Sequence, residues 1–258
     1  MRDPFRHTGL DHGDGENHGP EVAVSTPNVM PKENHSLRYL VTGANRGIGL
    51  AFARHLSERG DQVLATARHP EKARGLAKLS RLEQLDVADE KSIASLARRI
   101  ADQPLDVLIN NAGIGDAGPR FGHVSIEELE QAFRANAIGP VAVTQALLPS
   151  LRAGQRRTVV NLSSGLASIS ENESGGWIAY RASKAALNQL TRTMAGELKK
   201  EGFICIAICP GWVKTDMGGH GASVSPDDSV AAMLKVVDRL KPSDTGRFLD
   251  RRGKQLPW

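Results

Sequence analysis

The sequence predicts an α/β protein in which helices cover both faces of a single doubly wound parallel sheet. From residue 37 onward, short apolar runs alternate with stretches of helical period. The runs are almost continuously apolar, as in strands that are buried on both faces. A glycine cluster follows the first run directly. A closed eight-stranded barrel is the rival arrangement, and the seven runs leave it one strand short.

The elements follow from the chain order. The first run, residues 37–42, precedes the glycines and a helix over about 48–59, which Gly60 ends because a left-handed residue is favoured there. Ser125-Ile-Glu-Glu128 has capping-box spacing and opens a long helix to about residue 150. The other expected strands are 62–67, 82–85, 106–110, 158–162, 203–209 and 247–249. The other expected helices are about 91–101, 177–200 and 229–240.

The composition is that of a globular protein. Its 258 residues suffice for one large core, and 40% are hydrophobic and 24% charged. No apolar stretch approaches the roughly 20 residues that span a bilayer. The formal charge of +4 is spread over basic residues interleaved with acids, which argues against a nucleic-acid partner. We therefore expect neither a membrane nor a nucleic acid among the partners.

The two cysteines give no sign of an oxidising compartment. Cys205 and Cys209 lie four residues apart on an expected strand, so their side chains share a face but are too far apart for a disulfide. Both are interpreted as small buried hydrophobic residues. A reducing cytoplasm is the expected location.

Residues 1–36 differ from the remainder of the chain. They contain four of the eight histidines, and no helical or strand period runs through them. We expect a disordered N-terminal tail followed by one Rossmann-type domain over 37–258, and Met30 is an alternative start. The irregular spacing of His7, His12 and His18 indicates solvated side chains rather than metal ligands, so no metal site is expected.

The first chemical motif is the glycine cluster in Thr42-Gly-Ala-Asn-Arg-Gly-Ile-Gly49, between the first strand and the first helix. Gly43 suits a tight turn, Gly47 lets backbone approach a pyrophosphate, and Gly49 permits close packing of helix on strand. The helix N-terminus then offers free amides to the phosphates. A glycine trio is a weak signal alone, and its placement after a strand favours a dinucleotide.

Two arginines bear on the kind of dinucleotide. The second strand ends in Thr66-Ala67-Arg68, without the acid that bonds the adenosine ribose of NAD. Arg46 lies inside the glycine loop. Two guanidinium groups suit a 2′-phosphate, so the sequence favours NADP(H) over NAD(H).

The third motif is Tyr180-Arg-Ala-Ser-Lys184. Residues four apart on a helix share a face, so the phenol and the ammonium can address one ligand. A phenol with a pKa near ~10 is a poor acid–base group at neutral pH, and a nearby cation favours its ionised form. Such pairs also arise by chance on many helices.

Three further motifs follow expected strands: Asn110-Asn111-Ala112-Gly113, Ser163-Ser164 and Pro210-Gly211. With the glycine loop and Tyr180-x-x-x-Lys184, they resemble the classical short-chain dehydrogenase/reductase family over essentially all of residues 37–258. The stretches 210–219 and 246–258 further resemble its carbonyl-reductase-like branch, which includes the bacterial C-factor protein.

The resemblance implies four catalytic residues. Tyr180 would exchange a proton with the carbonyl oxygen, and Lys184 would lower the pKa of that tyrosine and bond the nicotinamide ribose. Ser164 would hold the substrate oxygen. Asn136 would position a water for proton relay, and a structural asparagine is its alternative interpretation.

The choice of serine rests on the family pattern, which favours the second of Ser163 and Ser164. Tyr180 follows Ser164 after a longer loop than is usual in the family, as it does in the C-factor-like branch. Ser168 and Ser170 are nearer to the tyrosine but further from the end of the strand. Ser163 is then expected to be a structural hydroxyl.

The resemblance also implies the cofactor contacts, with Asp86 and Val87 at the adenine and the backbone of 111–113 along the cofactor. Residues 210–215 would flank the nicotinamide. The whole expected set is Gly43, Asn45, Arg46, Gly47, Ile48, Gly49, Arg68, Asp86, Val87, Asn111, Ala112, Gly113, Tyr180, Lys184, Pro210, Gly211, Val213 and Thr215.

We therefore expect an NADP-dependent oxidoreductase that transfers a hydride between NADP(H) and a small carbonyl or alcohol substrate. The C-factor likeness raises an alternative, an NADP(H)-binding signalling or sensor protein with little turnover. Family members commonly pair through their two long helices, so a homodimer or homotetramer is expected. The sequence does not identify the carbonyl.

Overall fold

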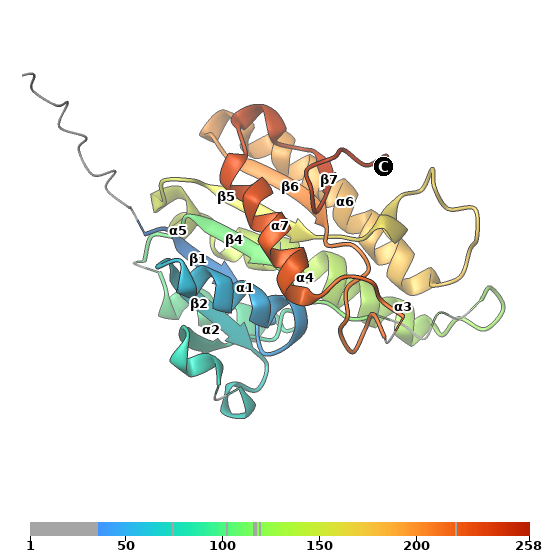
Figure 1. Cartoon of the computed structure of the whole chain (residues 1–258), viewed down its shortest axis with the longest axis horizontal. Coiled ribbons are helices and arrows are strands. Elements are labelled where there is room, and N and C mark those ends of the chain that lie inside the picture. The colour runs from blue at the N-terminus through green and yellow to red at the C-terminus, as the bar shows by residue number, and fades with distance from the viewer. Residues whose placement is uncertain (1–35, 74, 102, 116–117, 119, 220) are drawn as a thin grey trace, which may run out of the picture. The chain divides into compact units, whose positions relative to one another are not determined.

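The computed structural model describes residues 36–258 except 74, 102, 116–117, 119 and 220, and Figure 1 shows their arrangement. The expected tail, residues 1–36, lies outside the described residues except at Ser36. The division of the chain at this point therefore stays a prediction.

The described residues form a seven-stranded sheet, and every strand pairing among them is parallel. The strand order is β3-β2-β1-β4-β5-β6-β7. The predicted doubly wound sheet is thus confirmed and the barrel is excluded. The order reverses between β1 and β4, where ligands bind in folds of this kind. The strands are Arg38–Val41 (β1), Gln62–Ala67 (β2), Arg81–Gln84 (β3), Val107–Asn110 (β4), Thr158–Leu162 (β5), Ile204–Cys209 (β6) and Phe248–Asp250 (β7).

Helices cover both faces of the sheet (Figure 1). On β1, Tyr39 and Val41 belong to the core that includes side chains of α1 and α7, whereas Leu40 belongs to the core on the other face with side chains of α2, α4 and α6. This alternation is the period of two of a strand. The helices are Gly47–Glu58 (α1), Glu90–Arg99 (α2), Ile126–Phe133 (α3), Gly139–Ala146 (α4), Leu148–Ala153 (α5), Ile178–Leu198 (α6) and Pro226–Arg239 (α7).

The long helix expected over 125–150 is not continuous. It begins after Ser125, whose hydroxyl accepts from the amide of Glu128 at 3.4 Å. A π-helical turn, Arg134–Ile138, then separates α3 from α4. Pro140 explains the interruption, because it has no N–H to donate to the carbonyl of Asn136. Single π turns occur often at functional sites, and this one contains Asn136.

The helix ends agree with the expected glycine chemistry. Gly60 follows α1 with φ +87°, as predicted, and Gly202, with φ +80°, ends the 3₁₀ turn Lys199–Glu201 that continues α6. At the start of α6, Trp177 is left-handed with φ 52°, so the helix begins one residue later than expected. Cys205 and Cys209 are both free thiols, in agreement with the interpretation of their spacing.

Two glycines provide a test of the packing. A methyl group on Gly154 would lie 2.0 Å from the carbonyl oxygen of Leu105, whereas one on Gly196, inside α6, would meet nothing within 4 Å. We expect Gly154→Ala to lower the free energy of unfolding by about 1–3 kcal/mol through overpacking. We expect Gly196→Ala to raise it by up to about 1 kcal/mol through helix propensity. Urea denaturation measures both, and equal effects would contradict the packing at Gly154.

Candidate active site

The motifs singled out in the sequence follow the carboxyl ends of four neighbouring strands. The glycine loop follows β1, the Asn-Ala-Gly turn follows β4, the paired serines follow β5, and Pro210-Gly211 follows β6. Because these strands are adjacent and parallel, the four segments lie at the same edge of the sheet.

The glycine loop is closely packed against backbone. Gly43 has φ +64°, and a Cβ there would lie 2.9 Å from the Cα of Ala112. A Cβ on Gly49 would lie 2.4 Å from the carbonyl oxygen of Gly43. Throughout α1, which the structure describes completely, the first turn has no acid, and the residue before it supplies no side-chain cap. The amides of this turn are therefore suited to an anion.

Two side chains lock the glycine loop to the turn after β4. The hydroxyl of Thr42 accepts from the amides of Asn111 and Ala112, both at 3.0 Å. The side-chain amide of Asn111 donates in return to the carbonyls of Thr42 at 2.7 Å and Gly43 at 3.1 Å. Backbone from both strands thus forms one cradle, into which an added side chain at the glycines would not fit.

The two arginines lie at neighbouring strand ends. Arg68 follows β2 directly with an exposed side chain, and its main-chain carbonyl accepts from the side-chain amide of Gln84 at 3.3 Å. Arg46 is exposed and forms an ion pair with Asp216, from the loop after β6. The sequence interpretation did not anticipate this partner, because the two residues are 170 positions apart.

The turn after β3 contains Asp86 and Val87. The carboxylate of Asp86 accepts from the main-chain amide of Ala88 at 2.9 Å. The main-chain amide of Asp86 donates to the hydroxyl of Ser92 at 2.9 Å. A Cβ on Gly139 would lie 2.6 Å from the carbonyl oxygen of Val87, so the turn packs tightly on the start of α4.

Lys184 is a buried cation on α6. Its side chain is 5% exposed, and its Nζ donates to the carbonyl of Leu162, at the end of β5, at 2.7 Å. The Nζ lies 5.9 Å from the ring centroid of Tyr180, which is only partly buried. Burial lowers the pKa of Lys184 to about 8. The lysine ammonium and the tyrosine ring, expected from the helical spacing to share a face, therefore lie side by side.

Asn136 lies next to this pair and is fully buried. Its side-chain oxygen accepts from the amide of Ile114 at 2.8 Å, and its nitrogen donates to the carbonyl of Ile114 at 2.9 Å and to the hydroxyl of Ser183 at 3.0 Å. A Cβ on Gly113 would lie 2.9 Å from the Asn136 oxygen and 3.5 Å from the Nζ of Lys184. Only glycine leaves this space open.

The adjacent serines have different surroundings. Ser163 is 2% exposed, and its hydroxyl donates to Asn188 at 2.6 Å. The hydroxyl of Ser164, which is partly exposed, accepts from the amide of Leu166 at 3.2 Å and so caps the short 3₁₀ turn Gly165–Ala167. That bond leaves the hydroxyl hydrogen of Ser164 available to a ligand.

The loop after β6 returns to the glycine loop. Gly211 has φ +83°, and the carbonyl of Pro210 accepts from the hydroxyl of Ser229 at 2.7 Å. Val213 forms a parallel bridge with Val224. The Cγ2 of Thr215 would lie 3.1 Å from a Cβ on Gly47, so this loop closes over the start of α1.

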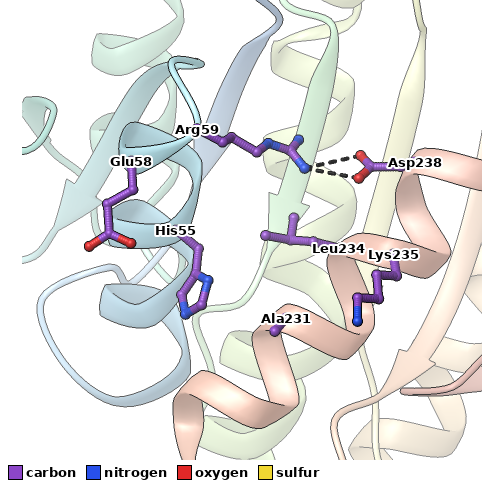
Figure 2. A pocket seen from close by; sticks show the side chains of 7 residues that line it. All are labelled: His55, Glu58, Arg59, Ala231, Leu234, Lys235 and Asp238. Atoms are coloured by element: carbon purple, nitrogen blue, oxygen red, sulfur yellow. Dashed lines mark hydrogen bonds and ion pairs between the residues drawn. The ribbon is translucent and has the colours of Figure 1, made fainter.

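Two hollows lie outside this constellation. One, of about 380 Å³, lies between α1 and α7 and is crossed by an ion pair from Arg59 to Asp238 at 3.0 Å (Figure 2). None of its lining residues belongs to the expected site. The other, of about 330 Å³, lies beside α6, and Leu166, Ile169, Ile178 and Arg181 help to line it.

Two classes of site receive no support from the described part of the chain. Among these residues no group of three or more His, Cys, Asp and Glu side chains is placed to hold a metal ion. None of the helices formed by them is long and apolar enough to cross a membrane.

Comparison with known proteins places this constellation in a family. Residues 38–223 match the model of the short chain dehydrogenases, and the chain belongs to that family. The C-signal protein of Myxococcus xanthus is 44% identical over 164 residues, which cover 64% of this chain and 99% of that protein. The family expected from the motifs is thus confirmed.

Solved structures of two carbonyl reductases share the fold. The NADPH-bound carbonyl reductase from chicken fatty liver is 36% identical and superposes with a TM-score of 0.80. The match covers 86% of this chain and 99% of that one. The carbonyl reductase Sniffer of Drosophila melanogaster is 31% identical and superposes with a TM-score of 0.83. That match covers 87% of this chain and 100% of the fly protein. The chain is therefore an oxidoreductase of a nicotinamide-dependent family.

The buried ammonium gives a pH-dependent stability. Because the pKa of Lys184 falls from 10.5 in the unfolded chain to about 8 in the folded one, the unfolded chain binds the additional proton between those values. Stability from this residue therefore rises as pH increases through the window, by up to roughly 3 kcal/mol, and the full penalty is present below it. Lys184→Met should lack this rise in urea denaturation at about pH 8 and about pH 10. A rise as large in the variant as in the wild type would contradict the assignment.

Proposed function

We propose that the protein catalyses the reversible reduction of a carbonyl to an alcohol with NADPH as hydride donor. The observation that carries the proposal is the buried Lys184, held by Leu162 and facing the ring of Tyr180. Membership of the short chain dehydrogenase family and the likeness to two carbonyl reductases support it. A small carbonyl or alcohol is the proposed substrate.

The residues of the site fit a nicotinamide dinucleotide. Side chains would fill the cradle at Gly43, Gly49 and Gly113, and the first turn of α1 offers amides without a competing acid. When bound, the cofactor supplies the hydride. The proposed contacts are those expected from the sequence, with Asp86 and Val87 at one end of the cradle and 210–215 at the other.

The proton transfer is assigned to Tyr180. In reduction its hydroxyl donates a proton to the carbonyl oxygen as negative charge develops there. Lys184, held in place by the Leu162 carbonyl, favours the phenolate that remains. The hydroxyl of Ser164 donates to the same substrate oxygen and orients it. In oxidation each group acts in the reverse direction.

Asn136 is assigned to the proton relay behind Lys184. Its side chain is fixed by both main-chain groups of Ile114, and Pro140 cannot donate to its carbonyl as a helical residue at that position would. A carbonyl in this situation can accept from a water that contacts the lysine. The relay thus follows from the π turn rather than from the asparagine side chain alone.

The preference for NADP(H) over NAD(H) is proposed from charge. Arg46 and Arg68 lie at the ends of adjacent strands and are both exposed. For Arg46 to bind a 2′-phosphate, it has to exchange the carboxylate of Asp216 for the phosphate. NADPH is bound in the chicken enzyme, which supports this choice.

The sensor alternative has one supporting observation, the match to the C-signal protein. The site does not favour it, because a protein that only reports cofactor binding has no need of a buried lysine facing a tyrosine. Turnover is therefore the preferred function.

Pairing of copies and location are also proposed rather than established. Ile126, at the start of α3, and Ile138, at the end of the π turn before α4, are 69% and 51% exposed, and Ala182, Ala185 and Ala186 offer small side chains on α6. These helices are the proposed contact of a homodimer or homotetramer, which sedimentation measures. The cytoplasm stays the proposed location.

The proton donor is tested by the two tyrosines of the chain, Tyr39 and Tyr180. Tyr180→Phe should lower kcat at least about 100-fold, while the Kd for NADPH stays within about twofold. The control is Tyr39→Phe: Tyr39 is buried on β1, its hydroxyl accepts from Arg59, and its loss should leave kcat unchanged.

Activity is followed at the nicotinamide absorbance with a panel of aldehydes, ketones and quinones. Normal turnover by Tyr180→Phe would show that another group donates the proton. Tight binding of NADPH by the wild type, with no oxidation across the panel, would favour the sensor instead.

The cofactor preference is tested by removing each arginine. Arg46→Ala and Arg68→Ala should each raise the Kd for NADPH about tenfold and leave the Kd for NADH nearly unchanged, because only the phosphate contact is lost. Arg98→Ala, an exposed arginine near the end of α2, is the charge-matched control. Equal weakening of both cofactors would contradict a 2′-phosphate role. Fluorescence titration at fixed ionic strength measures the Kd of each cofactor for the wild type and the three variants.

A further inference from the structure

The segment that follows β7 folds back along that strand. We call residues 251–258 the strap. The amide of Lys254 donates to the side chain of Asp250 at 2.8 Å, which closes the turn. Leu249 and Gln255 then form an antiparallel bridge, and the amide of Leu256 donates to the carbonyl of Phe248 at 2.9 Å. The strap thus covers the edge strand of the sheet.

The strap is anchored at Trp258. The indole ring stacks on Phe248 with a centroid distance of 5.6 Å, and the guanidinium of Arg192, on α6, lies 5.7 Å from it. Trp258 also packs against a small core cluster that includes Ala167, in the 3₁₀ turn after Ser164. Strand, helix and turn therefore meet at this one residue.

The main-chain oxygen of Trp258 holds the loop that follows Ser164. It accepts from the amides of Ile169 at 3.1 Å and Ser170 at 3.2 Å. It also accepts from the hydroxyls of Ser168 at 3.2 Å and Ser170 at 3.1 Å. Four donors from three consecutive residues thus converge on a single oxygen atom.

The other end of the same turn holds Ser164. The hydroxyl of Ser164 accepts from the amide of Leu166, and its carbonyl accepts from the amide of Ala167 at 3.0 Å. The amide of Gly165 donates to the sulfur of Cys209 at 3.1 Å. Between Ser164 and the residues held by the strap there is only this short turn, so a shift at Ser168 changes the direction of the Ser164 hydroxyl.

The remainder of the loop gives little support. Over residues 165–177 only Ala167 and Ser168 are buried, and Ile169 is 76% exposed. A segment with so few buried contacts opens easily unless it is held from outside. The strap supplies the contacts that the loop itself lacks.

We propose that the strap positions Ser164 for catalysis through Trp258. The inference rests on the proposed carbonyl reduction, in which the Ser164 hydroxyl orients the substrate oxygen. Trp258 is not among the proposed substrate or cofactor contacts and acts as a positioning residue. Displacement of a catalytic hydroxyl by about 1 Å costs up to roughly 100-fold in rate, so loss of the anchor should be measurable.

The kinetic test uses Trp258→Ala and Trp258→Phe. The alanine variant should lower kcat/KM for the carbonyl about tenfold with the Kd for NADPH within about twofold, whereas the phenylalanine variant retains the stacking and most of the activity. Lys254→Ala is the control, because Lys254 is exposed and closes the turn through its main-chain amide, which the substitution keeps. An unchanged kcat/KM in Trp258→Ala would overturn the proposal.

A double-mutant cycle separates positioning from general destabilisation. If the strap acts through the Ser164 hydroxyl, Ser164→Ala combined with Trp258→Ala should be no slower than Ser164→Ala alone. Fully additive losses would overturn the proposal. Trp258→Ala also alters a small core cluster, so a second variant is needed. Ser168→Ala combined with Ser170→Ala removes two of the four donors to the Trp258 oxygen and leaves that cluster intact. Its effect on kcat/KM should likewise be non-additive with that of Ser164→Ala.

Hydrogen exchange provides a measurement without turnover. In Trp258→Ala the amides of peptides covering 165–176 should exchange about tenfold faster or more, while peptides of α1 stay unchanged. Unchanged exchange in this loop would overturn the proposal. A wild type inactive on every carbonyl overturns the proposed function instead, and the exchange result keeps that failure distinct from failure of the strap.

Discussion

Burial of the Lys184 ammonium is the constraint on which the candidate site depends. Removing this charge from water is costly, and the carbonyl of Leu162, 2.7 Å away, satisfies only one of its three donors. The lysine nitrogen also borders the space between Tyr180 and Gly113, because a Cβ on residue 113 would lie 3.5 Å from it. An ammonium group with donors left over is stabilised further when oxygen atoms of a ligand accept hydrogen bonds from them. A glycine at position 113 thus keeps the space beside the lysine nitrogen open.

The surrounding elements fix the lysine through polar contacts as well as through apolar packing. Asn110 donates to Asn161 at 2.8 Å, and Asn161 donates to Thr191 on α6 at 2.8 Å, so β4, β5 and α6 are joined inside the protein. Asn136 adds a contact from the π turn to Ser183, next to Lys184. Buried polar bonds are directional, and a misplaced helix would leave them unsatisfied. Together they set the rotation of α6, and therefore where Tyr180 and Lys184 point.

Local features were predictable and distant partners were not. The strands follow from continuous apolar runs, and the glycine loop follows from conformations that only glycine adopts easily, so both could be assigned from neighbouring residues. The interruption near Asn136 was missed, although Pro140 inside the expected helix was a usable signal. The ion pair of Arg46 and the bonds of Trp258 to Ser168 join residues 170 and 90 positions apart, and no local pattern encodes them.

The groups proposed for catalysis and the loop that follows Ser164 have different support. Tyr180, Lys184 and Asn136 lie on helices, where packing fixes them to the precision that proton transfer requires. Ile169, 76% exposed, lies on a loop, where substitutions are more readily tolerated. Ser164 lies between β5 and that loop. Bonds from Trp258 to 168–170 hold the near part of the loop to the edge of the sheet. Residues 171–175 are exposed and lie beyond these bonds, so substitutions there leave the bonds in place.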